Sequence, residues 1–212
     1  MEPFIRNDQY NFIRRQVQRL VNGHSTVADQ SVLQALESLV EEKVLGRFGQ
    51  LTDEQRWLLD PLSHIQDKEE AERFLAHLKP YLIPFNDVNE QTVKKLFPKA
   101  KKLKVPALVK TDLREFSYVG WDDIGSQRRY LILQQDGKLV GVSGSFNSSM
   151  KKGICAFCNN HTETGLFLSE TKGSTQDTFV KKGNYICRDS RTCNRNLTSL
   201  ERIEEFVDRL QS

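Results

Sequence analysis

The chain has 212 residues, of which 38% are hydrophobic and 28% are charged, with a formal net charge of +3. This composition is typical of a globular protein, and no run approaches the ~18 consecutive apolar residues of a membrane span. The low net charge excludes a polycation that coats nucleic acid, and the first residues lack the basic and apolar segments of a signal peptide. We therefore expect a cytoplasmic protein with one large or two small domains.

The N-terminal part of the chain has the pattern of helices joined by short loops. Apolar residues recur at helical spacing in residues 4–22 and 27–48. Capping-box patterns that begin at Thr52 and Asp67 mark two shorter helices. Short loops favour antiparallel neighbours, so this part is predicted to be a helical bundle, with Trp57 in its core.

After Pro84 the pattern changes from helices to strands. A short helix is predicted over residues 89–97, and a run of lysines follows it. Strands at residues 130–134 and 139–142 flank Asp136-Gly137, a pair typical of a tight hairpin turn. A β-hairpin is therefore expected in this part of the chain.

The C-terminal segment predicts a second hairpin and a closing helix. Residues 165–168 and 178–180 are the expected strands, with a polar tip at residues 171–177. Thr198 and Glu201 have the spacing of a capping box in front of an amphipathic run. Together these elements indicate an α+β domain.

All four cysteines belong to one pattern, Cys155-Ala-Phe-Cys158 followed by Cys187 and Cys193. A C-x-x-C turn presents two thiolates to one ion, and the wider second pair fits a cysteine that ends a hairpin strand and one that begins a helix. That arrangement is a treble clef, and four thiolates predict a closed structural Zn²⁺ site. Two disulfides, four free thiols, or His161 as a competing ligand are the alternatives, and disulfides would require an oxidising compartment.

The predicted fold class is therefore α+β, in two domains. Residues 1–84 form the N-terminal helical bundle, and residues 85–212 form a C-terminal α+β domain. The zinc finger occupies about residues 150–212 and has a treble-clef-like, four-cysteine form. Because so short a segment has a small core, the metal is expected to contribute on the order of 10 kcal/mol to its folding.

The chain lacks the patterns of the common catalytic sites. It has no H-E-x-x-H, G-x-S-x-G, Walker-type or dinucleotide motif. Zinc deaminases need an H-x-E upstream of the C-x-x-C and a proline before it, whereas His161-Thr-Glu163 lies downstream and Ile154 precedes Cys155. A closed four-thiolate site also has no position for a reactive water. We expect a binding protein rather than an enzyme.

Cationic residues surround the predicted metal site. A Zn²⁺ ion with four thiolates carries a formal charge of −2, so some cations, such as Arg188, serve charge compensation. Lys181, Lys182 and Tyr185 are expected on a turn beside the metal, where a basic and aromatic surface would bind an acidic protein. The same residues, or the lysine run at residues 94–104, would also suit RNA, so an RNA- or ribosome-binding zinc module is the alternative.

Longer motifs resemble one known family, the elongation-factor-G-binding proteins, which include the FusB-type fusidic acid resistance proteins. The resemblance covers essentially the whole chain and is tightest at residues 181–190 together with Cys193. Further matching segments are Gln9-Tyr-Asn-Phe-Ile-Arg14, Lys101-Lys-Leu-Lys-Val-Pro106, Val119-Gly-Trp121 and Arg129-Tyr-Leu-Ile132. Such a set of motifs is much more specific than C-x-x-C alone.

The resemblance implies a helical N-terminal domain, a treble-clef zinc domain and a non-enzymatic function. Members bind elongation factor G through the zinc domain, contact the C-terminal domains of the factor and promote its release from the ribosome. Translation is thereby protected from fusidic acid. A bacterial cytoplasmic location and indirect action on ribosome-bound complexes follow, and we expect a monomer.

The resemblance also implies roles for particular residues. Cys155, Cys158, Cys187 and Cys193 match the zinc ligands. Lys182 and Tyr185 match positions that contact the factor, and Lys181 and Arg188 are their basic neighbours. The residue before the first cysteine is Phe in FusB-type proteins and Ile154 here, which keeps an apolar contact with less ring area.

Overall fold

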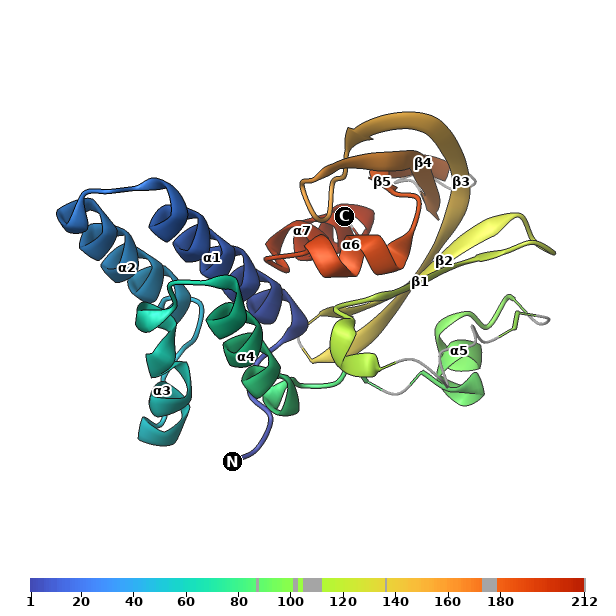
Figure 1. Ribbon diagram of the computed structural model, residues 1–212. Helices are drawn as coiled ribbons and strands as arrows, with labels where there is room; N and C mark the ends of the chain where they lie inside the picture. Colours follow the sequence, from blue (N-terminus) through green and yellow to red (C-terminus); the bar gives the residue numbers. More distant parts are fainter. Residues whose placement is uncertain (87, 101–102, 105–111, 136, 173–178, 212) are drawn as a thin grey trace. The chain divides into compact units, whose positions relative to one another are not determined.

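The computed structural model describes residues 1–86, 88–100, 103–104, 112–135, 137–172 and 179–211. The chain divides into two compact units, Met1–Ile83 and Pro84–Ser212, which are described separately here (Figure 1). The predicted boundary after residue 84 between independently folding domains stays a prediction. Within the described ranges, no helix combines the length and apolarity that crossing a membrane requires.

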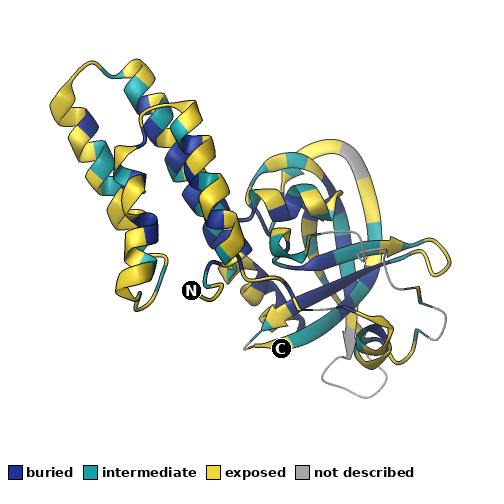
Figure 2. Cartoon of the chain, turned by 60° about the horizontal axis from the view of Figure 1, so that its bottom comes forward, coloured by how far each residue is buried: buried dark blue, intermediate teal, exposed yellow. Residues whose placement is uncertain are grey.

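Unit Met1–Ile83 consists of helices. They are α1 Asn7–Thr26, α2 Gln30–Leu45, α3 Asp53–Leu59, η1 Asp60–His64, α4 Lys68–Leu78 and η2 Lys79–Tyr81. Buried apolar residues recur every three or four positions along α1, as at Ile13, Val17 and Leu20, and pack with Val40 and Val44 of α2. In Figure 2, buried and exposed residues alternate along the helices of this unit, which is the amphipathic pattern of a helical bundle.

The helix starts in this unit follow the predicted caps. The hydroxyl of Thr52 accepts from the N–H of Gln55, whose side chain accepts from the N–H of Thr52. Asp67 accepts from the N–H of Glu70 at the start of α4. The placement of Trp57 in the core was wrong, because its side chain is 75% exposed on α3 and the neighbouring Leu58 is buried instead.

Unit Pro84–Ser212 is built on an antiparallel sheet with strand order β1-β2-β3-β4-β5 (Figure 1). The strands are β1 Val119–Asp123, β2 Arg128–Gln135, β3 Lys138–Ile154, β4 His161–Lys172 and β5 Phe179–Cys187. The helices are α5 Glu90–Leu96, η3 Leu113–Glu115, α6 Ser190–Asn196 and α7 Glu201–Gln211. The sheet and the helices around it form the α+β architecture that the sequence predicts.

Strand β2 is buried on both faces because two different cores contact it. Tyr130 and Ile132 belong to the core that includes Phe97, next to α5, whereas Leu131 and Leu133 belong to the core of α7. This split follows the period of two along a strand. The sheet therefore has α5 on one face, and the other face packs against α7.

Both predicted hairpins are present, with longer strands than expected. β2 pairs with β3, and Gly137 in the turn has a positive φ of 73°. β4 pairs with β5, and it includes Thr171 and Lys172 of the predicted tip. Residues 173–177 of that tip and Thr178 of the predicted strand, like Asp136, lie outside the described residues. The last helix begins at Glu201, and the Ser199 hydroxyl, not the predicted Thr198, is the acceptor for the N–H of Glu201.

Candidate metal centre

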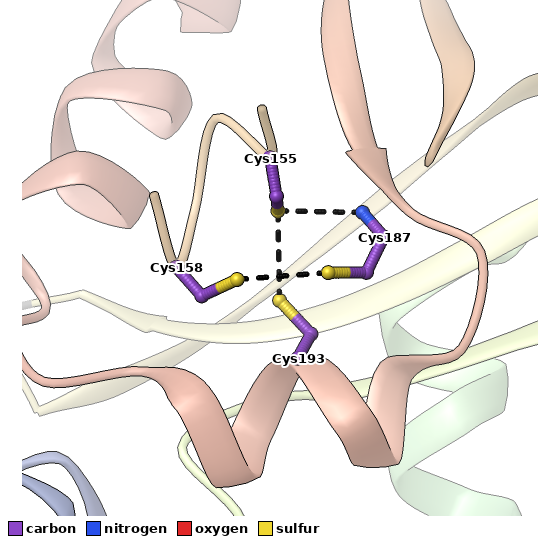
Figure 3. A group of neighbouring side chains, drawn as sticks. All are labelled: Cys155, Cys158, Cys187 and Cys193. Carbon is purple, nitrogen blue, oxygen red and sulfur yellow. Dashed lines mark hydrogen bonds between the residues drawn. The ribbon is translucent and has the colours of Figure 1, made fainter. Parts of the chain in front are cut away.

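The four cysteines come from three parts of the C-terminal unit. Cys155 and Cys158 lie on the turn between β3 and β4, Cys187 is the last residue of β5, and Cys193 lies within α6. Figure 3 shows their sulfur atoms pointing toward one common centre. The second pair thus connects the end of a hairpin strand to a helix, as the predicted treble clef requires.

The spacing of the sulfur atoms fits one tetrahedral metal ion. The Sγ atoms of Cys155 and Cys193 are 3.8 Å apart, and those of Cys158 and Cys187 are 3.6 Å apart. All four sulfurs lie within 4.8 Å of one another. Four sulfurs bonded to Zn²⁺ at about 2.3 Å lie about 3.8 Å from each other, whereas a disulfide bond is about 2.05 Å long. The disulfide alternative therefore does not fit, and His161 is not part of the cluster among the described residues.

The electrostatics of the cluster also favour a cation. All four side chains are buried. The pKa of Cys155 is lowered because the thiols of Cys158, Cys187 and Cys193 donate hydrogen bonds to it. The pKa of Cys193 is raised well above its ordinary value because its neutral thiol is hydrogen-bonded to Cys155. One thiolate thus opposes the ionisation of the next, and all four ionise together only when a divalent ion balances their charge.

Backbone groups fix the first cysteine pair beside β5. The N–H groups of Phe157 and Cys187 donate to the sulfur of Cys155 at 3.4 and 3.3 Å. The N–H of Ala156 donates to the carbonyl oxygen of Tyr185 at 2.8 Å. Asn159 closes the turn with a positive φ of 56°, a conformation that asparagine tolerates better than most residues. The turn is therefore tied to the strand that carries Tyr185.

Asn194 anchors the helix that carries Cys193. Its side chain is buried, and its oxygen accepts from the N–H groups of Ser117 and Tyr118 at 2.7 and 3.2 Å. Its amide nitrogen donates to the carbonyls of Tyr118 and Ser190, both at 2.9 Å. The start of α6 is capped by Asp189, which accepts from the N–H groups of Arg191 and Thr192. The position of Cys193 is thus set by hydrogen bonds to the chain just before β1.

Arg129 on β2 anchors the backbone at Cys187, the other cysteine of the second pair. Only 5% of this residue is exposed, and its guanidinium donates to the carbonyls of Cys187 and Arg188 at 2.9 and 2.8 Å. It also binds the Asp122 carboxylate through two bonds of 2.6 and 2.7 Å and lies 3.3 Å from the centroid of the Phe146 ring. One buried cation therefore connects β1, β2 and β3 to the backbone around a cysteine of the cluster.

Of the predicted partner-binding residues, Ile154, Tyr185 and Arg188 lie next to this centre, whereas Lys181 and Lys182 lie farther along β5. Ile154 ends β3 and Tyr185 lies on β5, with exposed fractions of 57% and 50%. Lys181 is exposed and 3.5 Å from Glu170, Lys182 is half-buried, and the exposed Arg188 is 3.4 Å from Glu163. The expected turn at residues 181–185 was wrong, because these residues are part of strand β5.

Two family models match the chain. The model described as elongation factor G-binding protein, N-terminal, matches residues 4–86, and the FBP C-terminal treble-clef zinc-finger model matches residues 93–210, more than half of the chain. The chain belongs to the elongation factor G-binding protein family. A search of curated proteins found no match.

A solved structure supports this assignment to the elongation factor G-binding protein family. The chain is similar to the fusidic acid resistance protein FusC, with 29% sequence identity and a TM-score of 0.83 over 97% of each chain. The treble-clef match and the four converging sulfurs support one structural Zn²⁺ ion. Sequence reasoning missed Arg129 and Asn194 as supports of this centre, since a lone arginine or asparagine gives no sign of its distant partners.

Proposed function

We propose that this chain binds elongation factor G through its zinc-finger unit and acts without catalysis. Binding to the C-terminal domains of the factor would promote its release from the ribosome and so protect translation from fusidic acid. The observation that carries the proposal is the match of residues 93–210 to the zinc-finger model of this family. The likeness of the whole chain to a fusidic acid resistance protein adds support. A monomer in the bacterial cytoplasm fits this role.

The surface beside the zinc centre suits a protein partner. Ile154 directly precedes Cys155, and the N–H of Ala156, which follows Cys155, donates to the carbonyl of Tyr185. This bond holds the exposed side chains of Ile154 and Tyr185 on neighbouring, rigid segments of backbone. Lys181, Lys182 and Arg188 add positive charge around them. Aromatic anchors and cations on a preorganised surface are common binding hot spots for an acidic partner.

The proposed release follows from differential affinity. A binding partner shifts a conformational equilibrium only as far as it binds one state more tightly than the other. The chain must therefore bind the released conformation of elongation factor G better than the ribosome-bound one. No bond of drug or factor needs to be broken, and the four thiolates leave a zinc ion no open position for a reactive water.

Calorimetry of the zinc-loaded protein with purified elongation factor G tests the proposal directly. Lys182→Ala and Tyr185→Ala should each weaken binding by more than about 1 kcal/mol if these residues are hot spots. Lys138→Ala, at the start of β3, and Trp57→Ala, in the helical unit, are the controls, since both replace an exposed residue of similar type.

Three outcomes of this experiment separate the alternatives. Equal affinities for all four variants would refute the assignment of Lys182 and Tyr185 to the contact surface. A folded, zinc-replete protein without affinity for the factor would reject the partner. In that case, binding of ribosomal RNA that weakens steeply with salt would favour the RNA-binding module instead.

A further inference from the structure

The outer edge of strand β5 has a defined hydrogen-bonding direction. β5 is the last strand in the sheet order, and among the described strands it pairs with β4 alone (Figure 1). Two bonds leave it on the opposite side from β4: the carbonyl of Tyr185 accepts from Ala156, and the N–H of Cys187 donates to the sulfur of Cys155. Both residues therefore present their backbone groups to the outer edge.

The same direction extends along the strand in steps of two residues. In an antiparallel ladder, the N–H and C=O of one residue point to the same side, and successive residues alternate. The registered pairs from Thr164 with Cys187 to Lys172 with Phe179 run without a shift. Lys181 and Gly183 thus also face the outer edge, whereas Lys182 and Asn184 face β4.

The zinc turn covers only one end of this outer edge. It takes the carbonyl of Tyr185 and the N–H of Cys187, while no hydrogen bond to the outward groups of Lys181 and Gly183 is found among the described residues. Lysine on an exposed edge also discourages two copies of a protein from pairing. An open stretch of edge thus continues directly from the proposed partner surface.

The two residues proposed to contact elongation factor G lie on opposite faces of β5. Side chains alternate along a strand, so Lys182 shares a face with the buried Ile186, and Tyr185 points to the other face. A partner that lies flat against one face reaches only one of them. A partner that approaches along the edge reaches both.

We propose that elongation factor G adds an extended segment to the outer edge of β5 as a further antiparallel or parallel strand. This inference rests on the proposed function and concerns the way in which the factor binds. Backbone bonds to Lys181 and Gly183 supply the affinity, and the side chains on either face supply selectivity. The added segment carries acidic residues that face Lys181 and Lys182, and an apolar residue that packs against Tyr185.

Amide hydrogen exchange, followed by NMR with and without purified elongation factor G, tests the added strand. In the free protein, the amides of Lys182 and Asn184 should exchange slowly and those of Lys181 and Gly183 rapidly. Complex formation should slow exchange at Lys181 and Gly183 by at least about tenfold. Binding that leaves these two amides unchanged overturns the proposal and leaves the proposed function intact, whereas absence of binding rejects the proposed function.

A proline substitution provides a second, independent test. Lys181→Pro removes an outward N–H without removing a bond to β4, and Lys181→Ala is the control for the lost side chain. We expect Lys181→Pro to raise the Kd for the factor about tenfold above that of Lys181→Ala, with equal zinc content. Equal Kd values for the two variants overturn the proposal. It is also overturned if, without the factor, exchange of the Lys181 and Gly183 amides slows as the protein concentration rises, because a second copy of the chain then occupies the edge. If Lys181→Pro loses zinc, the exchange data on the unmodified protein decide.

Discussion

Replacement of Arg129 by lysine tests whether one buried guanidinium holds the zinc centre in place. The substitution keeps a positive charge on β2 but removes the planar set of donors that binds four acceptors. Arg128→Lys is the matched control, because the neighbouring Arg128 is half-buried and, among the described residues, donates a side-chain hydrogen bond to the carbonyl of Ser143 alone, at 3.4 Å. The two variants change the same residue type at successive positions of one strand.

The structure sets the expected size of the effect. Arg129 serves the carbonyls of Cys187 and Arg188, and a buried acceptor left without a donor costs about 1–3 kcal/mol. A lysine ammonium satisfies one of them. The pair with Asp122, whose side chain is 55% exposed, adds less than about 1 kcal/mol. We expect Arg129→Lys to lower the free energy of unfolding of this unit by about 1–4 kcal/mol.

Denaturant unfolding and zinc release provide the two readouts. A Trp57→Phe background removes the exposed tryptophan of the helical unit, so that Trp121 on β1 reports unfolding of the zinc-finger unit. Arg129→Lys should also release zinc to a chelator about 10–100 times faster, as expected when a group that orients a metal ligand is lost. The role assigned to Arg129 is refuted if Arg129→Lys and Arg128→Lys differ by less than about 0.5 kcal/mol in the free energy of unfolding and by less than about twofold in the rate of zinc release.

Three further predictions concern the packing of a glycine, the removal of zinc and the pH dependence of a helix cap. Gly141→Ala should destabilise the C-terminal unit by about 1–3 kcal/mol in urea unfolding, since a Cβ at this position would lie 2.9 Å from atoms of Leu96 and Phe97. Gly49→Ala is the control and should be nearly neutral, because its Cβ would have no atom within 4 Å. Removal of zinc should abolish the folded fluorescence of Trp121 and leave the helical circular dichroism of the N-terminal unit; unchanged fluorescence would show that the unit folds without metal. The pKa of Asp29 at the start of α2 is lowered, chiefly by the Ser31 hydroxyl. Its stabilising effect, measured against Asp29→Ala, should therefore be complete above about pH 4 and disappear as the pH falls through this lowered pKa.

Local patterns carried most of the fold prediction. Helix caps at Thr52 and Asp67, the hairpin turn before Lys138 and the cysteine spacing depend on residues close in sequence, and the structure shows each of them. These features are readable because a few neighbouring side chains determine the backbone conformation.

Features that depend on distant segments were missed or placed wrongly. Trp57 was assigned to the core by its hydrophobicity, but helix α3 turns Leu58 and Leu59 inward and leaves the indole exposed. Residues 181–185 were expected on a turn, and their lysine, glycine and asparagine residues are depleted in strands. Pairing with β4 overrides that preference. Which face of a helix or which strand is covered is decided by tertiary packing, which a single sequence does not display.

The zinc centre connects the stability of this unit to its proposed interface. The bonds from Ala156 to Tyr185 and from Cys187 to Cys155 close one end of the β5 edge, and both depend on the turn that the metal holds. Without zinc, this turn loses its constraint, and Tyr185 loses its fixed backbone as the unit unfolds. A structural metal thus sets both the length of the open edge and the position of the aromatic residue beside it. Loss of zinc should therefore weaken binding of elongation factor G at the same time as it unfolds this unit.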